Sequence, residues 1–118
     1  MFYTEFMSGA LFGLRVVEFS AIGPVPFCGM LFADMGADVL RLDRVNDPGL
    51  GIGKDPRFDV LGRGKRSIVV DLKRSKHIEL SLDLAARADI LIEGYRPGIM
   101  ERLGLGPGVC LVRNPRLV

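Results

Sequence analysis

The stretch GLRVVEFSAIGPVPFCGMLFADMGADVLRLDR, residues 13–44, decides the fold. Its β-branched apolar run LRVVEF, Leu14–Phe19, is bounded by a glycine and by a proline-containing turn, and it predicts a buried strand. Apolar residues at helical spacing follow in FCGMLFADMG, where Pro24 or Pro26 suits the opening turn and Gly36 the helix end. ADVLRLDR predicts the next strand. The stretch is therefore a βαβ unit with parallel strands.

The remaining sequence extends this unit into a larger sheet. SIVVDL, Ser67–Leu72, and DILIE, residues 89–93, predict two more strands. SKHIELSLDLAARA between them predicts a helix with Ser75 as its N-cap. Residues 45–64 are rich in glycine and proline and have no sustained period, so we expect a long loop. The expected fold class is α/β, a Rossmann-like open parallel sheet with flanking helices.

The last part of the sequence predicts shorter elements. We expect a helix from about Pro97 to Leu103, a further short helix after GLGP, and a fifth strand that begins in NPRLV, residues 114–118. Because a parallel strand needs neighbours and a covering layer, we expect the sheet to be truncated. The expected organisation is an N-terminal extension, residues 1–12, followed by one incomplete domain, residues 13–118.

Composition and charge favour one globular domain with a local basic segment. The chain has 118 residues, of which 48% are hydrophobic and 25% are charged. Residues 54–76 carry eight lysines and arginines against three aspartates, a net charge of +5, although the whole chain carries only +2. Such a patch suits a compact anionic ligand better than a long nucleic acid, and a solvated charged loop is the alternative. No apolar run reaches about 18 residues, so we expect no membrane span and a cytoplasmic location.

Sequence motifs for common cofactors and catalytic groups are absent. The first loop reads SAIGPVPF instead of GxGxxG, and its prolines lack the N–H groups of a phosphate cradle, which disfavours nicotinamide and flavin cofactors. Cys28 and Cys110 lack the spacing of a metal site or a disulfide framework, and we expect both to be buried as small apolar residues. The single histidine, His77, falls in the first turn of a predicted helix, where solvation is its usual state. We expect no metal and no resident cofactor.

Arginines lie at the ends of several predicted strands. Arg44 follows LRLD and Arg96 follows DILIEGY, so both belong at the carboxyl ends of parallel strands, where ligands of open α/β sheets bind. Arg66 precedes SIVVDL and belongs at an amino end unless the preceding loop folds back over the sheet. A guanidinium group binds phosphate oxygens through two parallel hydrogen bonds. Together these arginines favour a phosphate-bearing ligand, whereas each alone is also explained as a surface arginine.

Several blocks of the sequence, in order, resemble the opening part of the alpha-methylacyl-CoA racemases of the family III CoA-transferase superfamily. The blocks are residues 13–44, LGRGKRSIVVDLK, ADILIEGYRPGIMERLGLGP and NPRLV, and together they extend from Gly13 to Val118. The resemblance implies a Rossmann-like domain that holds coenzyme A, in a homodimer of interlocked chains that acts in fatty acid metabolism. Coenzyme A enters as part of the acyl-CoA thioester substrate. The resemblance implies no nucleic-acid or membrane partner.

The resemblance also implies which residues contact the substrate. Arg44 corresponds to an arginine at the nucleotide end of coenzyme A, and Arg96, within GYRPG, corresponds to an arginine close to the thioester and its phosphates. The residues implied to line the adenine and ribose are Val69, Val70, Asp71 and Leu72. A site of this kind explains why the chain places an arginine directly after the strand DILIE.

The implied reaction inverts the carbon next to a thioester. A base removes the proton from one face to give an enolate, and an acid returns a proton on the other face. In the racemases, a histidine in a Gly-His-Asp motif and a separate aspartate do this, and both follow the NPRLV segment. We therefore expect no catalytic residue in these 118 residues and no activity of this chain alone. A family III CoA-transferase, which uses a covalent aspartyl intermediate, and a non-catalytic module for coenzyme A binding or dimerisation are the alternatives.

Overall fold

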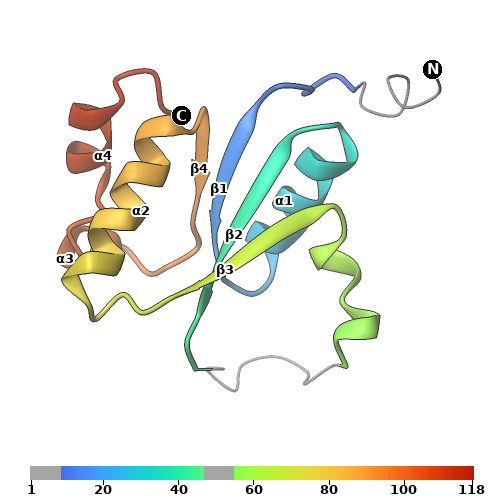
Figure 1. Ribbon diagram of the computed structural model, residues 1–118, viewed down its shortest axis with the longest axis horizontal. Coiled ribbons are helices and arrows are strands. Elements are labelled where there is room, and N and C mark those ends of the chain that lie inside the picture. The colour runs from blue at the N-terminus through green and yellow to red at the C-terminus, as the bar shows by residue number, and fades with distance from the viewer. Residues whose placement is uncertain (1–8, 47–54) are drawn as a thin grey trace.

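The expected βαβ unit and the parallel sheet are confirmed. The computed structural model describes residues 9–46 and 55–118. Figure 1 shows the arrangement of the elements in space. The helices and strands are, in chain order, β1 (Arg15–Phe19), α1 (Pro24–Asp34), β2 (Asp38–Arg44), β3 (Lys65–Val70), α2 (Ser75–Arg87), β4 (Ile90–Ile92), α3 (Ile99–Arg102) and α4 (Pro107–Arg113).

Local sequence explains where α1 begins and ends. Pro24 occupies the first helical position, where its missing N–H has no intrahelical partner to lose. Gly23 before it has a φ of 78°, and Gly36, predicted to end the helix, has a φ of 95°. Both values are left-handed, and glycine adopts them without steric strain. The loops at both ends of α1 are thus set by residue type.

Several expected features differ in detail in the structure. β3 begins and ends two residues earlier than expected, at Lys65 and Val70. The prediction of Ser75 as N-cap is wrong, because Arg74 has the extended cap conformation and Ser75 is already the first helical residue. The predicted loop contains two 3-10 turns, Pro56–Phe58 and Val60–Gly62. The glycine- and proline-rich sequence of the loop did not indicate these turns. Residues 47–54 of that loop lie outside the described residues.

All four strands of the sheet are parallel, and their order is β3-β2-β1-β4. Val16 of β1 lies opposite Val39 of β2 on one side and Ile90 of β4 on the other. This order, in which the chain moves outward in one direction and then crosses to the other side of β1, is the arrangement of a Rossmann-like fold. It brings the ends of β2 and β4 close to each other across β1.

Helices cover both faces of the sheet (Figure 1). Val17 and Phe19 point to the face covered by α2, α3 and α4, where the larger apolar core lies. Val16 points to the face covered by α1, where a smaller core forms with Phe32 and Ala33. Because β1 is buried on both faces, it reads as a continuous apolar run rather than an alternating one. The exception in that run is Glu18, which is fully buried.

The NPRLV segment does not form the expected fifth strand within residues 114–118. Its last residue nevertheless pairs with the free edge of β4: the Val118 N–H donates to the Asp89 carbonyl at 3.1 Å, and the Leu91 N–H donates to the Val118 carbonyl at 2.9 Å. These are the two hydrogen bonds of a parallel pairing opposite Ile90. The segment thus takes the position, but not the length, of the strand that was expected.

The N-terminal residues that are described pack onto the domain. The Leu11 N–H donates to the Met35 carbonyl at 2.9 Å, and Leu11 contacts the core on the α1 face. The expected extension of residues 1–12 lies in part outside the described residues, and its domain boundary stays a prediction. No helix in residues 9–46 and 55–118 is long and apolar enough to cross a membrane.

Candidate functional site

The carboxyl ends of the four parallel strands form one edge of the sheet, which we call the carboxyl rim. Each strand there passes into a connecting segment, so side chains from distant parts of the sequence meet. Ligands of open α/β sheets bind at this edge. The segments of the carboxyl rim are residues 20–23 after β1, Arg44 at the end of β2 with residues 45–46, residues 71–74 after β3 and residues 93–98 after β4.

Arg44 and Tyr95 meet at the carboxyl rim. The guanidinium carbon of Arg44 lies 4.9 Å from the centre of the Tyr95 ring, close enough for a cation–π interaction. The Tyr95 ring in turn packs edge-on against Phe19, with ring centres 6.3 Å apart. Since Phe19 ends β1, which lies between β2 and β4, the aromatic pair connects the ends of these two neighbouring strands. The prediction that Arg44 lies at the carboxyl edge is confirmed.

The GYRPG loop is held in place by its backbone and by its first glycine. The Tyr95 N–H donates to the carboxylate of Glu93 at 2.7 Å. A Cβ at Gly94 would lie only 2.8 Å from Cγ2 of Val25, in the first turn of α1, so the loop packs directly on that turn. Arg96 follows Tyr95 and is exposed, and no ion pair of its side chain is found within the described parts of the chain. The loop thus presents a guanidinium group to solvent at the carboxyl rim.

The predicted adenine and ribose residues do not share one environment. Val69 is exposed, whereas Val70 is buried in the core beneath α2, because successive strand residues face opposite sides of the sheet. Leu72 packs partly against the same core. Asp71 accepts a hydrogen bond from the Lys73 N–H at 3.0 Å and so shapes the turn into α2. Contact of Val69, Val70, Asp71 or Leu72 with a ligand stays a prediction, and for Val70 only the backbone is available.

His77 has a structural partner in this turn. Its Nδ1 accepts a hydrogen bond from the Asp71 N–H at 2.7 Å, which places the imidazole between the end of β3 and the start of α2. The ring is partly buried, so the expectation of a merely solvated histidine is incomplete.

Among the described residues, four bases of the basic segment form ion pairs. Arg57 pairs with Asp55, and Arg63 pairs with Asp34, whose pKa is lowered chiefly by the hydrogen bond from Arg63. Arg66 pairs with Asp38 at 2.6 Å at the amino ends of β2 and β3, so it lies away from the carboxyl rim. Lys65 pairs with Glu18 in the interior. The other described bases of this segment are Lys73, Arg74 and Lys76, near the start of α2, and the described residues show no ion pair for them.

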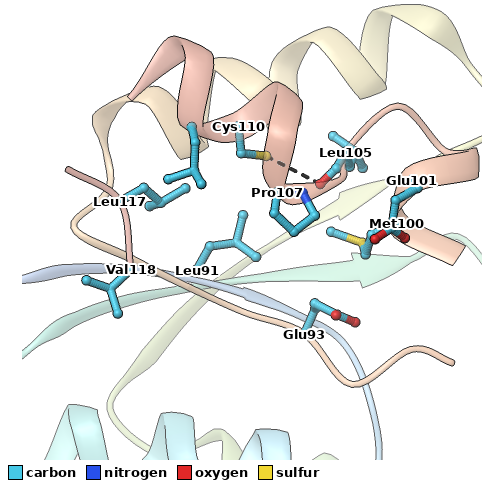
Figure 2. A pocket seen from close by; sticks show the side chains of 10 residues that line it. Leu91, Glu93, Met100, Glu101, Leu105, Pro107, Cys110, Leu117 and Val118 are labelled. Atoms are coloured by element: carbon cyan, nitrogen blue, oxygen red, sulfur yellow. Dashed lines mark hydrogen bonds between the residues drawn. The ribbon is translucent and has the colours of Figure 1, made fainter. Parts of the chain in front are cut away.

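A cavity of about 260 Å³ lies beside β4, on the face of the sheet that α3 and α4 cover. Figure 2 shows that the end of β4, α3, α4 and the C-terminal segment each contribute to its wall. The wall is largely apolar, with Leu91, Met100, Leu105 and Val118, and Glu93 connects it to the carboxyl rim. Cys110 lies in this wall and donates to the Leu105 carbonyl at 3.3 Å; burial raises the pKa of its thiol. This confirms the expectation of a buried cysteine for Cys110, but the same expectation is wrong for Cys28, which is only partly buried.

The carboxyl rim can bind and orient an anionic ligand. Two guanidinium groups and an aromatic ring lie at one edge, which suits phosphate groups and a planar base. Within the described ranges, no three histidine, cysteine or acidic side chains gather as metal ligands would. The sequence did not lead us to assign Tyr95 to the carboxyl rim. Its position next to Arg96, just after an apolar run, was the feature that could have indicated this role.

Comparisons with known proteins agree on one family. The family model described as CoA-transferase family III matches residues 11–118. The chain is 45% identical over 106 residues to a mouse (Mus musculus) alpha-methylacyl-CoA racemase, covering 90% of this chain and 26% of that protein. It is 48% identical over 111 residues to the human (Homo sapiens) alpha-methylacyl-CoA racemase, covering 92% of this chain and 27% of that protein. The chain thus spans about a quarter of the length of these curated relatives.

A solved structure shows the same fold. The crystal structure of a hypothetical protein from Mycobacterium tuberculosis superposes with a TM-score of 0.84 at 35% identity. The superposition covers 94% of this chain and 32% of that one. The α/β fold and the family resemblance expected from the sequence are therefore both confirmed.

Proposed function

Because the chain belongs to CoA-transferase family III, we propose that it forms the coenzyme A-binding part of an enzyme that acts on acyl-CoA thioesters. The observation that supports this most is the meeting of Arg44 and Tyr95 at the carboxyl rim, directly beside Arg96. In this proposal Arg44 binds the nucleotide end of coenzyme A, and Arg96 binds close to its phosphates and thioester. Tyr95 keeps the Arg44 guanidinium oriented. Coenzyme A is part of the substrate, and we propose no separate cofactor.

We further propose that the enzyme is an alpha-methylacyl-CoA racemase, which inverts the carbon next to the thioester of a 2-methylacyl-CoA. The identity of 45% and 48% to two racemases supports this choice. The thioester acidifies the adjacent proton, and removal and return of a proton on opposite faces pass through an enolate. The residues of this chain bind and orient the substrate, and none is assigned to the proton transfer. His77 holds the turn into α2, where its Nδ1 accepts a hydrogen bond from the Asp71 N–H.

The assembly and location that go with this activity are also proposals. The family resemblance supports a homodimer, with an acyl-CoA thioester as the small-molecule partner. A cytoplasmic location and the absence of nucleic-acid and membrane partners stay predictions from the sequence. Gel filtration with light scattering tests the homodimer. Fractionation of cells that express the chain tests the location.

Two measurements on the 118-residue chain test the proposal. Calorimetric titration with coenzyme A should show saturable binding, and incubation of a 2-methylacyl-CoA in D₂O should show no exchange at the α-carbon. Absence of coenzyme A binding would overturn the proposed role of the carboxyl rim. Deuterium incorporation by the purified chain would overturn the division between binding here and proton transfer elsewhere.

A family III CoA-transferase is the second candidate, because the matching family model carries that description. Such an enzyme moves coenzyme A between carboxylates through a covalent aspartyl intermediate. The two candidates share the coenzyme A site and differ in the reaction. Expression of the complete reading frame, followed by assays for α-carbon exchange and for coenzyme A transfer to a free carboxylate, separates them. Binding without either reaction identifies a non-catalytic module.

A further inference from the structure

We propose that the buried ion pair between Glu18 and Lys65 positions the carboxyl rim for coenzyme A, an inference that rests on the function proposed above. Lys65 Nζ lies 2.7 Å from Glu18 Oε2, and the two side chains are 1% and 0% exposed. Glu18 belongs to β1 and Lys65 to β3, and β2 lies between these strands. The ion pair therefore spans β2 on the face of the sheet that α1 covers.

Both partners of the pair touch α1. Lys65 Nζ donates to the Pro26 carbonyl, in the first turn of α1, at 3.0 Å. Gly29, one turn further along, lies so close that a Cβ there would collide with Glu18 Oε2 and would lie 2.9 Å from Lys65 Nζ. The helix backbone thus rests directly on the ion pair, and the sequence has glycine at the point of closest approach.

The first turn of α1 in turn carries the GYRPG loop. Val25, next to Pro26, packs against Gly94 with no room for a side chain at that position. Tyr95 follows Gly94, and its ring contacts the Arg44 guanidinium. A contiguous series of contacts therefore connects the ion pair to Arg44: from Lys65 to Pro26, through Val25 to Gly94, and from Tyr95 to Arg44.

The surroundings of Glu18 indicate that the pair serves geometry more than stability. Neither carboxylate oxygen of Glu18 has a well-aligned hydrogen-bond partner among the described residues, although Lys65 is at ion-pair distance. The other charged groups that act on Glu18 are Arg41 and Asp43 of β2. Buried ion pairs are often replaced by apolar residues without loss of stability, because the desolvation of the charges offsets their attraction. Stability and positioning can thus be separated by mutation.

The test compares one single variant, one double variant and one control. Lys65→Met leaves the Glu18 carboxylate buried without a partner, whereas Glu18→Met with Lys65→Met replaces the pair by apolar side chains of similar length. The control is Arg63→Met, which breaks the exposed pair with Asp34 at the other end of α1. Each is made in a Tyr3→Phe background, because the chain has two tyrosines and no tryptophan, so that fluorescence then reports Tyr95 alone.

Three measurements are made on each variant: urea unfolding, acrylamide quenching of Tyr95 fluorescence, and calorimetric titration with coenzyme A. We expect Lys65→Met to lower stability. We expect the double variant to recover stability but to bind coenzyme A about tenfold more weakly, because a displaced loop no longer presents Arg44 correctly. Its Tyr95 should be quenched more strongly than in the wild type. Arg63→Met should match the wild type in quenching and affinity.

The outcomes separate this inference from the proposed function. A double variant with wild-type quenching and wild-type affinity would overturn the positioning role, because the pair would then only fill space. If the wild-type chain does not bind coenzyme A, the proposed function fails. Tyr95 quenching still decides the positioning role in that case, since it needs no ligand: stronger quenching in the double variant supports the role, and unchanged quenching rejects it.

Discussion

Arg44 reaches the Tyr95 ring across the end of β1, although 51 positions separate them in the sequence. The contact of an exposed guanidinium with an aromatic ring contributes only about 0.5–1 kcal/mol. Its greater effect is to restrict the rotamers of a long side chain, so that less conformational entropy is lost when a phosphate binds. At this scale the site depends on orientation more than on the number of positive charges, because four of the described bases in the basic segment are already paired.

The first prediction concerns Arg44. Replacing it by alanine should weaken coenzyme A binding by about 1.5–3 kcal/mol, the usual range for a hydrogen bond to a charged group. Arg44→Lys should recover only part of this, because lysine keeps the charge but loses the planar fork. Arg87→Ala, which removes an exposed arginine from the last turn of α2, is the matched control. Equal affinities of Arg44→Ala and the wild type in calorimetry would remove Arg44 from the site.

The second prediction concerns Gly94. The added methyl group of Gly94→Ala would lie 2.8 Å from Val25 Cγ2, so the loop or the first turn of α1 must move. We expect a loss of about 1–3 kcal/mol in the free energy of unfolding, as for other overpacked sites, together with weaker coenzyme A binding.

The control for Gly94 is another glycine of the chain. Gly108 lies within α4 with no heavy atom near its would-be Cβ, so Gly108→Ala should be neutral or stabilising by about 0.5–1 kcal/mol. Urea unfolding of both variants measures the difference. Equal stabilities of the two variants would show that Val25 can move aside without a loss in the free energy of unfolding.

Side chains at the C-terminal end of α4 connect this helix to α2. The Asn114 side-chain amide donates to the Ala85 carbonyl at 3.2 Å and to the Ala88 carbonyl at 2.7 Å, and so satisfies acceptors at the C-terminal end of α2. Arg113 also pairs with Glu79 and Asp83 of α2, but these acids are exposed. Exposed pairs contribute little, about 0–1 kcal/mol, so the amide is the stronger link.

The third prediction tests this link. Asn114→Asp keeps the size of the side chain but removes both donors, and it should lower the free energy of unfolding by about 1–3 kcal/mol because the Ala88 carbonyl loses its donor and the Ala85 carbonyl keeps only the Ala88 N–H. Arg113→Met should cost less, since only exposed pairs are lost. Urea unfolding monitored by circular dichroism compares the two. A larger loss in Arg113→Met than in Asn114→Asp would show that the ion pairs, and not the amide, hold α4 on α2.

The two faces of the whole molecule differ in chemistry. The face beneath α2, α3 and α4 is an apolar core centred on Phe19 and Leu42. The face beneath α1 contains a small apolar core and, beside it, the ion pair of Glu18 and Lys65. Arg41 on the same face pairs with Asp43 and with Asp59, the N-cap of the second 3-10 turn, which draws the long connection back onto the sheet. Ion pairs thus contribute to packing on the α1 face, whereas the face beneath α2, α3 and α4 is packed by apolar side chains.

The fourth prediction is a pH dependence of stability that arises from Glu18. Burial raises the pKa of this carboxyl above its ordinary value of 4.5, against the opposing contact with Lys65. Between the ordinary and the raised pKa the folded chain binds more protons than the unfolded chain. The Glu18 contribution is therefore fully present below about pH 4.5 and is lost as the pH rises through the folded pKa.

Urea unfolding from about pH 4 to 8 measures this effect in the wild type and in Glu18→Gln. The stability of the wild type relative to the variant should fall as the pH rises. The exposed Asp34 and Asp55 have lowered pKa values, chiefly through hydrogen bonds from Arg63 and Arg57, and should act in the opposite direction at acidic pH in both proteins. Parallel curves for the two proteins would show that Glu18 has the same pKa in the folded and unfolded chains.

Local sequence determined the order and type of the elements in this protein. The apolar run ending at Phe19, the prolines at the start of α1 and the glycine at its end act on their own neighbours, so residue type alone specifies them. The position of Arg44 and Arg96 at the carboxyl rim followed from the same reasoning, because parallel strands end at one edge. The boundaries of β3 and the N-cap of α2 were predicted wrongly, since small shifts there depend on pairing with β2.

Only the tertiary structure decided which charges remain available to a ligand. The basic segment predicted an anionic ligand, but two of its bases, Arg66 and Lys65, pair with Asp38 and Glu18, which are distant in sequence. Tyr95 became part of the site only because β4 lies beside β1 and so brings its loop next to Phe19 and the end of β2. The physical reason is that ion pairs and aromatic contacts act over a few ångströms between segments far apart along the chain, and strand order sets which segments come that close.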